Sequence, residues 1–337
     1  MRVQVTEPPL VTWQFPVRNS MPYLRETLAS MAAQTYPFHR VLAWDAGSTD
    51  GSLEILNQWI PAKIPGRVVS EDQNQAFNPL GENRRKMLLQ TETELCVCLD
   101  SDDISMPDRL ERQVERMLQK PSLVLLGTSL LYIDENGRPT GGRWDTETGD
   151  ADLRWRSKWA ASFGHPAVMF RRSAALAAGN YRGDVRCEDM DLWNRLSLRG
   201  EVENLPDFLV HYRRHSRSIS ANAGDLTSVR RETAAKTADV LFAGLSGARA
   251  MELWEASYPD GPLRGVRWRH LTDLRRTAVR FAERLGLRAG YFTDTELFKH
   301  QIWQMRRSYL HGLGLRPALD AYSRLRGQRE ARGTGPG

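Results

Sequence analysis

Short apolar runs alternate with stretches of helical periodicity over about the first 120 residues, and this alternation restricts the fold more than any other feature of the chain. In the intervening stretches apolar residues recur every three or four positions, as they do on one face of a helix. Strands that alternate with helices at these lengths predict a parallel sheet with helices on both faces. The expected strands are Leu10–Val17, Val41–Trp44, Arg67–Ser70 and Cys96–Leu99.

The pattern changes after this part of the chain. Strand-like runs continue, but they are no longer separated by regular helical stretches, and Asn136-Gly137 predicts a hairpin turn. We therefore assign residues 1–224 to one α/β domain with two halves, at about 1–120 and 121–224. The later strand-like runs are Leu123–Leu126, Leu130–Asp134, Ala167–Phe170 and Phe208–Tyr212.

The C-terminal third is expected to be helical and basic. From Asp225 onward strand signals vanish, and the chain carries 20 Lys and Arg against 12 Asp and Glu, compared with a net charge of +6 for all 337 residues. Residues 225–327 form the predicted helical region, and the polar, Gly-rich segment 328–337 is predicted to be disordered. A helix with an apolar stripe beside a basic face suits a membrane surface, although such helices more often pack on their own domain. We expect at most peripheral membrane attachment and no nucleic-acid partner.

Other features are consistent with a cytoplasmic protein. The first twelve residues carry an acid and two prolines where a signal peptide would be apolar, so no signal peptide is expected. No apolar run approaches the ~18 residues of a membrane span. Cys96, Cys98 and Cys187 lack the spacing of a zinc site, and an odd number on buried elements favours reduced thiols. We predict a cytoplasmic location, with at most peripheral contact at the inner face of the membrane.

Three acids follow the predicted strand Cys96–Leu99, namely Asp100, Asp102 and Asp103. The carboxyl end of a strand is where open α/β sheets bind ligands. Asp100 and Asp102 would point to one face of a continuing strand, and the three charges repel one another unless a cation lies among them. A solvated turn held by Asx hydrogen bonds is the alternative.

Two further acidic positions stand out. Asp45 ends the second predicted strand, directly before a glycine-containing turn that can open the next helix. Glu188 and Asp189 fall in the first turn of a predicted helix, where acids interact favourably with the helix dipole. Simple capping is therefore an alternative to a catalytic role for this pair.

Five segments, in this order, carry a resemblance to a known family: Phe15-Pro16-Val17-Arg18-Asn19, Asp45-Ala46-Gly47-Ser48-Thr49-Asp50-Gly51, Asp100-Ser101-Asp102-Asp103, Glu188-Asp189, and Tyr212-Arg213-Arg214-His215 with Ser218-Ile219-Ser220. The chain resembles the family 2 glycosyltransferases over roughly residues 10 to 222. The resemblance implies the GT-A fold, a Rossmann-like, mostly parallel sheet that binds a nucleotide-diphospho-sugar. The helical C-terminal extension lies outside the resemblance.

The resemblance also implies a nucleotide and metal site. Asp45 would accept a hydrogen bond from the nucleotide base, and Asp100 would contact the ribose or reach the metal through water. Asp102 would ligate Mn²⁺ or Mg²⁺ on the diphosphate. His215 is either a further metal ligand or a hydrogen-bonding group beside the phosphates. The other residues expected at the nucleotide are Pro16, Val17, Arg18, Ser101 and Arg214, with Arg213 and Arg214 both expected to fold over the diphosphate.

The same resemblance implies the catalytic base. Asp189 would take the proton from the acceptor hydroxyl as that hydroxyl attacks the anomeric carbon, so the reaction would invert this carbon. Glu188 or Asp191 would orient the base. The choice among these neighbouring acids is open at this stage.

The implied enzyme is metal-dependent and inverting, and moves a sugar from a nucleoside diphosphate, with UDP favoured, to a glycan or glycolipid. Such transfers serve polysaccharide, lipopolysaccharide or other glycoconjugate synthesis. The register of Glu82-Asn83-Arg84-Arg85 against the Arg-Asn pair of the family is ambiguous, which leaves the donor base open. One alternative is a sugar-nucleotide nucleotidyltransferase, disfavoured because Pro16-Val17-Arg18-Asn19-Ser20 has no glycine. The other is a non-catalytic basic module that binds a membrane or nucleic acid.

Overall fold

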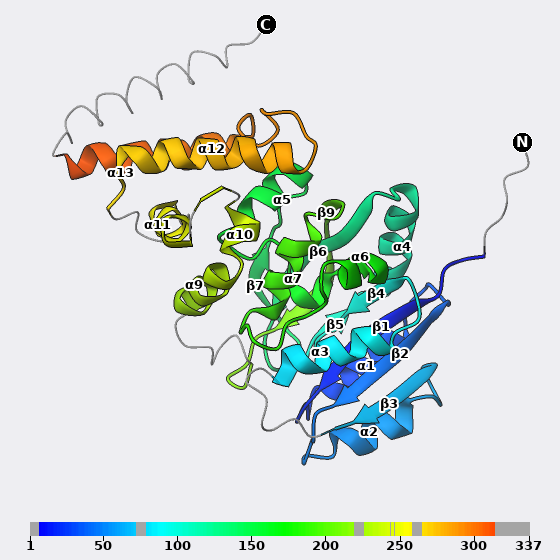
Figure 1. The fold of residues 1–337 in the computed structure, drawn as a ribbon. Helices are drawn as coiled ribbons and strands as arrows, with labels where there is room; N and C mark the ends of the chain where they lie inside the picture. The colour runs from blue at the N-terminus through cyan, green and yellow to red at the C-terminus, as the bar shows by residue number, and fades with distance from the viewer. Residues whose placement is uncertain are drawn as a thin grey trace, which may run out of the picture. The chain divides into compact units, whose positions relative to one another are not determined.

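The computed structural model describes residues 7–71, 79–218, 226–242, 244–245, 247–257 and 265–313 (Figure 1). The chain forms two compact units, residues 1–237 and 238–337. Helix α9 (Leu226–Lys236) belongs to the first unit. The division after residue 224 remains a prediction about domains, and the predicted disordered tail at 328–337 lies outside the described residues.

Four parallel strands form the N-terminal part of the sheet in the order β3-β2-β1-β4, which confirms the predicted parallel arrangement. Each connection contains a helix because parallel neighbours need a long crossover. The strands are β1 (Val11–Val17), β2 (His39–Asp45), β3 (Gly66–Ser70) and β4 (Leu95–Cys98). The helices are α1 (Leu24–Ala32), α2 (Ser52–Trp59), α3 (Pro79–Gln90) and, after β4, α4 (Arg109–Gln119).

The remainder of the sheet mixes directions. β8 pairs antiparallel with both β4 and β6, β6 pairs parallel with β9, β9 pairs antiparallel with β5, and β7 pairs antiparallel with β6. These strands are β5 (Ile104–Ser105), β6 (Leu123–Ile133), β7 (Pro139–Trp144), β8 (Met169–Arg171) and β9 (Glu201–Arg213). The helical segments of this part are α5 (Asp150–Arg156), a 3₁₀ turn at His165–Ala167, α6 (Arg172–Ala177) and α7 (Glu188–Leu196).

β6 is one continuous strand, whereas the sequence predicts two strands separated at Gly127-Thr128-Ser129. Gly127 pairs with Asn204 of β9, and a Cβ on Gly127 would lie 2.0 Å from Asn204 Oδ1. A glycine inside a strand often marks such a close approach. Gly127 therefore makes room for a neighbouring side chain and does not end the strand.

Strand β4 divides the core into two layers. Cys96 and Cys98 pack in the cluster that contains Phe170 and Trp193, while Val97 packs in the larger cluster on the opposite face. Both faces are buried, as expected for a strand at the centre of a sheet with helices on either side. Burial raises the pKa of the Cys96 thiol well above its ordinary value. All three cysteines of the chain are free thiols.

A buried arginine fixes the end of β4. Arg109 at the start of α4 is fully buried, and its Nη2 donates to the carbonyl oxygens of Cys98 at 2.9 Å and Val168 at 3.4 Å. Its Nε donates to Gln113 Oε1 at 3.0 Å. Burial lowers the pKa of Arg109 to about 9. These bonds hold the backbone that leads into residues 100–103, which we call the acidic segment.

The second unit is helical in its described part, which confirms the predicted C-terminal helices there. It contains α10 (Ala238–Leu241), α11 (Gly247–Ser257), α12 (Trp268–Arg284) and α13 (Glu296–Gly312). In α12 the apolar residues at helical spacing are buried, including Leu271, Leu274, Ala278 and Phe281. None of the helices in the described ranges has the length and apolar character needed to span a membrane.

Candidate active site

The carboxyl ends of β1 and β2 lie side by side in the sheet. Val17 pairs with Asp45 and Pro16 with Trp44, so the predicted nucleotide-binding residues at these strand ends are neighbours. The Asp45 carboxylate is fully buried, and its Oδ2 accepts hydrogen bonds from Gly47 N at 3.2 Å and Ser70 Oγ at 3.1 Å. In this structure Asp45 orders the turn that follows β2. Its contact with a nucleotide base remains a prediction.

The loop after β1 is tied to the turn after β2. Asn19, which has a positive φ of 49°, accepts a hydrogen bond on Oδ1 from Thr49 N at 2.8 Å. Asn19 N in turn donates to Ser48 Oγ at 3.0 Å. Arg18 is exposed beside this junction. Arg18, which the sequence predicts at the nucleotide, therefore extends from a loop that is held in place by these hydrogen bonds.

Asp100, directly after Leu99, lies against two basic side chains. Arg84 Nη2 donates to Asp100 Oδ1 at 3.2 Å, and His165 Nδ1 lies 3.3 Å from the same oxygen. Burial alone would raise the pKa of Asp100, but His165 and Arg84 outweigh it and lower this pKa. Asp100 is thus held as a carboxylate.

Asp102, two residues after Asp100 in the acidic segment, contacts His215. His215 Nε2 lies 2.9 Å from Asp102 Oδ2, and the His215 ring packs on Tyr23 with centroids 4.7 Å apart. Burial and the negative charge of Asp100 raise the pKa of Asp102. The structure thereby brings together two of the three residues predicted at the metal, Asp102 and His215, which are 113 positions apart.

The donor chemistry of this pair fits a hard divalent cation. A carboxylate is a suitable ligand for Mn²⁺ or Mg²⁺, an imidazole is a common ligand of transition ions, and the negative charge of Asp100 beside Asp102 is one that a cation would neutralise. The pKa of Asp103 is raised well above its ordinary value by burial and by its two acidic neighbours. No cluster of three or more His, Cys, Asp or Glu side chains with metal-site geometry occurs in the described ranges. A bound cation would therefore draw most of its ligands from phosphate and water.

Ser101 links the acidic segment to the loop after β1. Its Oγ lies 2.5 Å from Ser20 Oγ, and its carbonyl oxygen accepts a hydrogen bond from Thr27 Oγ1 at 3.2 Å. Ser101 is thus a structural connection between two loops that the sequence predicts to contact the nucleotide.

The three acids at the start of α7 have different environments. Glu188 is buried and forms an ion pair with Arg84, and Asp191 is buried and receives a hydrogen bond from Arg195 Nη2 at 2.5 Å. Asp189 is half-buried, and its Oδ1 accepts a hydrogen bond from Met190 N at 2.7 Å. Across the described part of the chain Asp189 forms no ion pair. Of the three carboxylates it is the one available to a ligand.

Arg84 is the site residue whose role the sequence left undecided. It is buried, and it contacts Glu188 and Asp100 while its Nη2 lies 3.0 Å from His165 Nδ1. Burial would lower its pKa, but Glu188 and Asp100 raise it, so Arg84 stays charged. The sequence spacing could have predicted that Arg84 is buried. Arg84 stands three and four positions before the buried Met87 and Leu88, so it shares the inner face of α3.

Arg213 and Arg214 also differ. Arg213 is buried and donates to the backbone oxygen of Asp102 from Nε at 2.8 Å and to Glu26 Oε2 from Nη2 at 2.5 Å. It braces the acidic segment from inside, which differs from the predicted position over a diphosphate. Arg214 is exposed, with its guanidinium over the Tyr132 ring at 5.1 Å.

The arrangement of strands and helices is that of the GT-A fold class, as two solved structures show. The structure of S. aureus TarS 1-349 in complex with UDP-GlcNAc superposes with a TM-score of 0.60, 18% identity, and coverage of 89% of this chain and 92% of that chain. The mannosyltransferase PcManGT from Pyrobaculum calidifontis, in complex with GDP-Man and Mn²⁺, gives a TM-score of 0.50 at 17% identity, covering 90% and 88%. These likenesses establish the fold.

The sequence comparisons give the family. The model described as "Glycosyl transferase family 2" matches residues 14–177. The amylovoran biosynthesis glycosyltransferase AmsE of Erwinia amylovora is 29% identical over 203 residues, which cover 60% of this chain and 74% of that protein. The chain is therefore similar to glycosyl transferase family 2 over residues 14–177, and it is a glycosyltransferase.

Proposed function

We propose that this chain transfers a sugar from a UDP-sugar to an acceptor hydroxyl, with a divalent cation at Asp102 and inversion at the anomeric carbon. The observation that carries the proposal is the Arg84 bridge, because it joins Asp100 at the end of β4 to Glu188 at the start of α7. Asp189, beside Glu188, is therefore close to the acids expected at the diphosphate. The base can act on an acceptor hydroxyl at the donor sugar only if it lies this close to the residues that hold the diphosphate.

On the donor side, Asp102 and His215 would hold Mn²⁺ or Mg²⁺. Bound there, the cation would neutralise charge that develops on the departing diphosphate. Arg213 supports this arrangement from within, since it holds the Asp102 backbone oxygen at 2.8 Å. Its bonds to the acidic segment keep Asp102 in place without a direct contact to the ligand.

On the acceptor side, Asp189 is proposed as the base. Its Oδ1 is engaged with Met190 N, and Oδ2 accepts no hydrogen bond from any described residue. The acceptor hydroxyl would give its proton to this carboxylate while its oxygen bonds to the anomeric carbon. The bond from that carbon to the diphosphate oxygen breaks, and UDP leaves on the opposite face.

UDP is preferred as the donor nucleotide because the TarS complex, which covers most of both chains, contains UDP-GlcNAc. The AmsE relative is named for amylovoran biosynthesis, which supports a role in the synthesis of a cell-envelope polysaccharide or related glycoconjugate. We further propose that the protein acts in the cytoplasm on a glycan or glycolipid. Peripheral membrane contact would use the basic helices, in which Trp268 is exposed.

Isothermal titration with UDP, GDP and dTDP, each with and without Mn²⁺, tests the donor site. We expect UDP to bind most tightly, and Mn²⁺ to strengthen this binding in the natural chain but not in Asp102→Asn. Absence of binding to all three nucleotides would refute the proposal. Release of pyrophosphate from a nucleoside triphosphate and sugar phosphate would indicate nucleotidyl transfer instead. With UDP-sugar and an accepted glycan, NMR of the product should show an inverted anomeric centre.

A further inference from the structure

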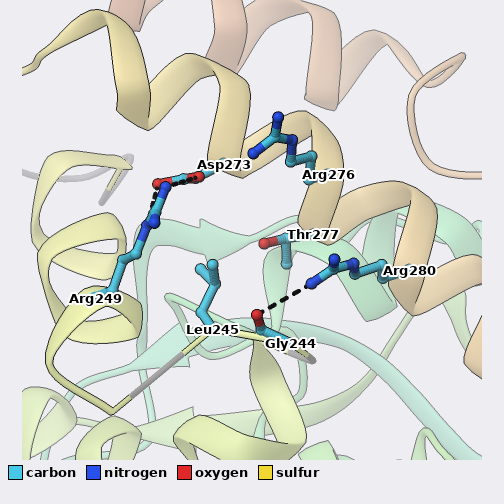
Figure 2. Close-up of a pocket in the computed structure, with 7 residues that line it drawn as sticks. All are labelled: Gly244, Leu245, Arg249, Asp273, Arg276, Thr277 and Arg280. Atoms are coloured by element: carbon cyan, nitrogen blue, oxygen red, sulfur yellow. Dashed lines mark hydrogen bonds and ion pairs between the residues drawn. The ribbon is translucent and has the colours of Figure 1, made fainter.

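The second unit contains a polar cavity of about 190 Å³ (Figure 2). A water molecule occupies roughly 30 Å³ in the liquid, so the cavity has room for a small ion and a few waters. Four of its lining residues are spaced i, i+3, i+4 and i+7 along α12, which places them on one helix face. The lining residues are Gly244, Leu245, Arg249, Asp273, Arg276, Thr277 and Arg280.

The single acid of the cavity is already neutralised. Arg249 Nε donates to Asp273 Oδ2 at 2.9 Å, and Nη2 donates to Oδ1 at 2.7 Å. This bidentate ion pair leaves Arg276 and Arg280 as the excess charge of the cavity. The two arginines are four residues apart on α12, where like charges destabilise a helix. An anion between them would remove this repulsion.

Arg280 is held at the cavity by the backbone. Its Nη1 donates to the Gly244 carbonyl oxygen at 3.0 Å, and a Cβ on Gly244 would lie 2.1 Å from the same nitrogen. Gly244 also has a positive φ of 85°, which favours glycine. Arg276 has no ion pair or hydrogen bond to any described residue. The guanidinium of Arg280 is therefore already held at the cavity, and that of Arg276 can move to bind a ligand.

Thr277 supplies the observation that points to a ligand. Its side chain is 1% exposed, and its Oγ1 has no hydrogen-bond partner within the described structure. Figure 2 shows this hydroxyl between the Arg249–Asp273 ion pair and the Arg280–Gly244 contact. A buried hydroxyl without a partner costs free energy, so native structures rarely keep one. An oxyanion in the cavity would accept this hydrogen bond.

We propose that this cavity binds a phosphoryl group, either as free phosphate or as a phosphate ester. Thr277 Oγ1 would donate to one phosphate oxygen, and the guanidinium groups of Arg276 and Arg280 would bind the others. Guanidinium N–H groups match phosphate oxygens in geometry and charge. The site belongs to the second unit alone and does not depend on the proposed glycosyl transfer.

Titration calorimetry of the full chain with inorganic phosphate at low salt tests the site. We expect saturable binding that is about tenfold weaker in Arg276→Gln, in Arg280→Gln and in Thr277→Val, as for loss of one charge-assisted hydrogen bond. Thr277→Ser keeps the hydroxyl and should bind within about twofold of the natural chain. Arg275→Gln is the matched control, because Arg275 is exposed on α12 but does not line the cavity.

The outcomes separate the possible sources of the phosphoryl group. Vesicles of phosphatidylcholine with phosphatidic acid, compared with phosphatidylcholine alone, test a lipid headgroup. If the natural chain sediments with the acidic vesicles and Thr277→Val does not, the ligand is a lipid headgroup. Phosphate binding without vesicle binding would assign a soluble phosphate or ester. No phosphate binding, or equal weakening by Arg275→Gln and Arg276→Gln, would overturn the proposal. Circular dichroism confirms that each variant is folded.

Discussion

Arg84 and Glu188 form a buried ion pair across 104 positions of sequence, with side chains only 7% and 4% exposed. The same guanidinium contacts Asp100 at 3.2 Å. One cation therefore compensates an acid at the end of β4 and another at the start of α7. Truncating one partner of such a pair leaves a buried charge without compensation.

Arg84→Met is therefore expected to lower the free energy of unfolding by about 3–5 kcal/mol, as measured by urea denaturation. The double variant Arg84→Met with Glu188→Gln should be more stable than the sum of the two single effects predicts. Arg85→Met is the control, because Arg85 is only half-buried and its ion pair with Glu82 is partly open to solvent. It should cost less than about 1 kcal/mol. Equal losses in both arginine variants would show that the buried pair is not responsible.

Asp189→Asn should lower kcat by roughly 10²–10⁴-fold while leaving UDP affinity and stability close to those of the natural chain. The reason is that Asp189 has no ion pair in the described structure to lose, but is the proposed base. Turnover of a UDP-sugar and calorimetric UDP binding measure the two effects.

Two neighbouring variants control for position in α7. Asp191→Asn should destabilise the fold, because Asp191 is buried against Arg195. If Glu188→Gln abolished turnover without destabilising the protein, while Asp189→Asn kept full activity, the role of base would pass to Glu188.

Gly127→Ala should destabilise the protein by about 1–3 kcal/mol, the usual cost of inserting an atom into a packed core. The added Cβ would lie 2.0 Å from Asn204 Oδ1, and Asn204 is itself held by bonds to the backbone oxygens of Glu147 and Ser162. Gly149→Ala is the matched control, because no atom lies within 4 Å of its added Cβ. Thermal unfolding of both variants provides the comparison, and an unaffected Gly127→Ala would show that Asn204 moves freely.

The surface ion pairs of Glu203 and Glu201 should make stability depend on pH. A hydrogen bond from Arg116 lowers the pKa of Glu203, and one from Lys120 lowers the pKa of Glu201. Because both folded pKa values lie below the unfolded ones, the stabilisation is complete above the ordinary carboxyl pKa. It is lost as the pH falls through the folded values.

Glu203→Gln should therefore cost at most about 1 kcal/mol near neutral pH, and this difference should shrink toward zero in acid. Urea denaturation of the two proteins over a pH series measures it. A difference that stays constant down to the most acidic pH would mean that the carboxylate charge plays no part.

Local patterns were sufficient to predict the parallel half of the sheet, because each strand there is a short apolar run followed by a helix. The acids at the strand ends were found for the same reason, and Asp102 and His215 do meet. The pairing of β8 with both β4 and β6 was not predictable, since it joins segments far apart in sequence and in opposite directions.

The direction of individual side chains does not follow from these local patterns. Arg84 and Arg85 are adjacent and chemically identical, yet the first is buried and the second is only half-buried. Arg213 is buried and Arg214 is exposed at the end of β9. Which of two adjacent side chains is buried depends on which face of the helix or strand is turned toward the core. An error of one residue in the predicted start of the element therefore exchanges the buried and the exposed positions.

The contact between Ser20 Oγ and Ser101 Oγ joins the loop after β1 to the acidic segment, so neither can be ordered independently of the other. If nucleotide orders the first loop and a cation the second, each ligand raises the affinity for its companion, by the same factor in both directions. A thermodynamic cycle of four dissociation constants would then close with positive cooperativity, and replacing either serine by alanine would bring the two binding events nearer to independence.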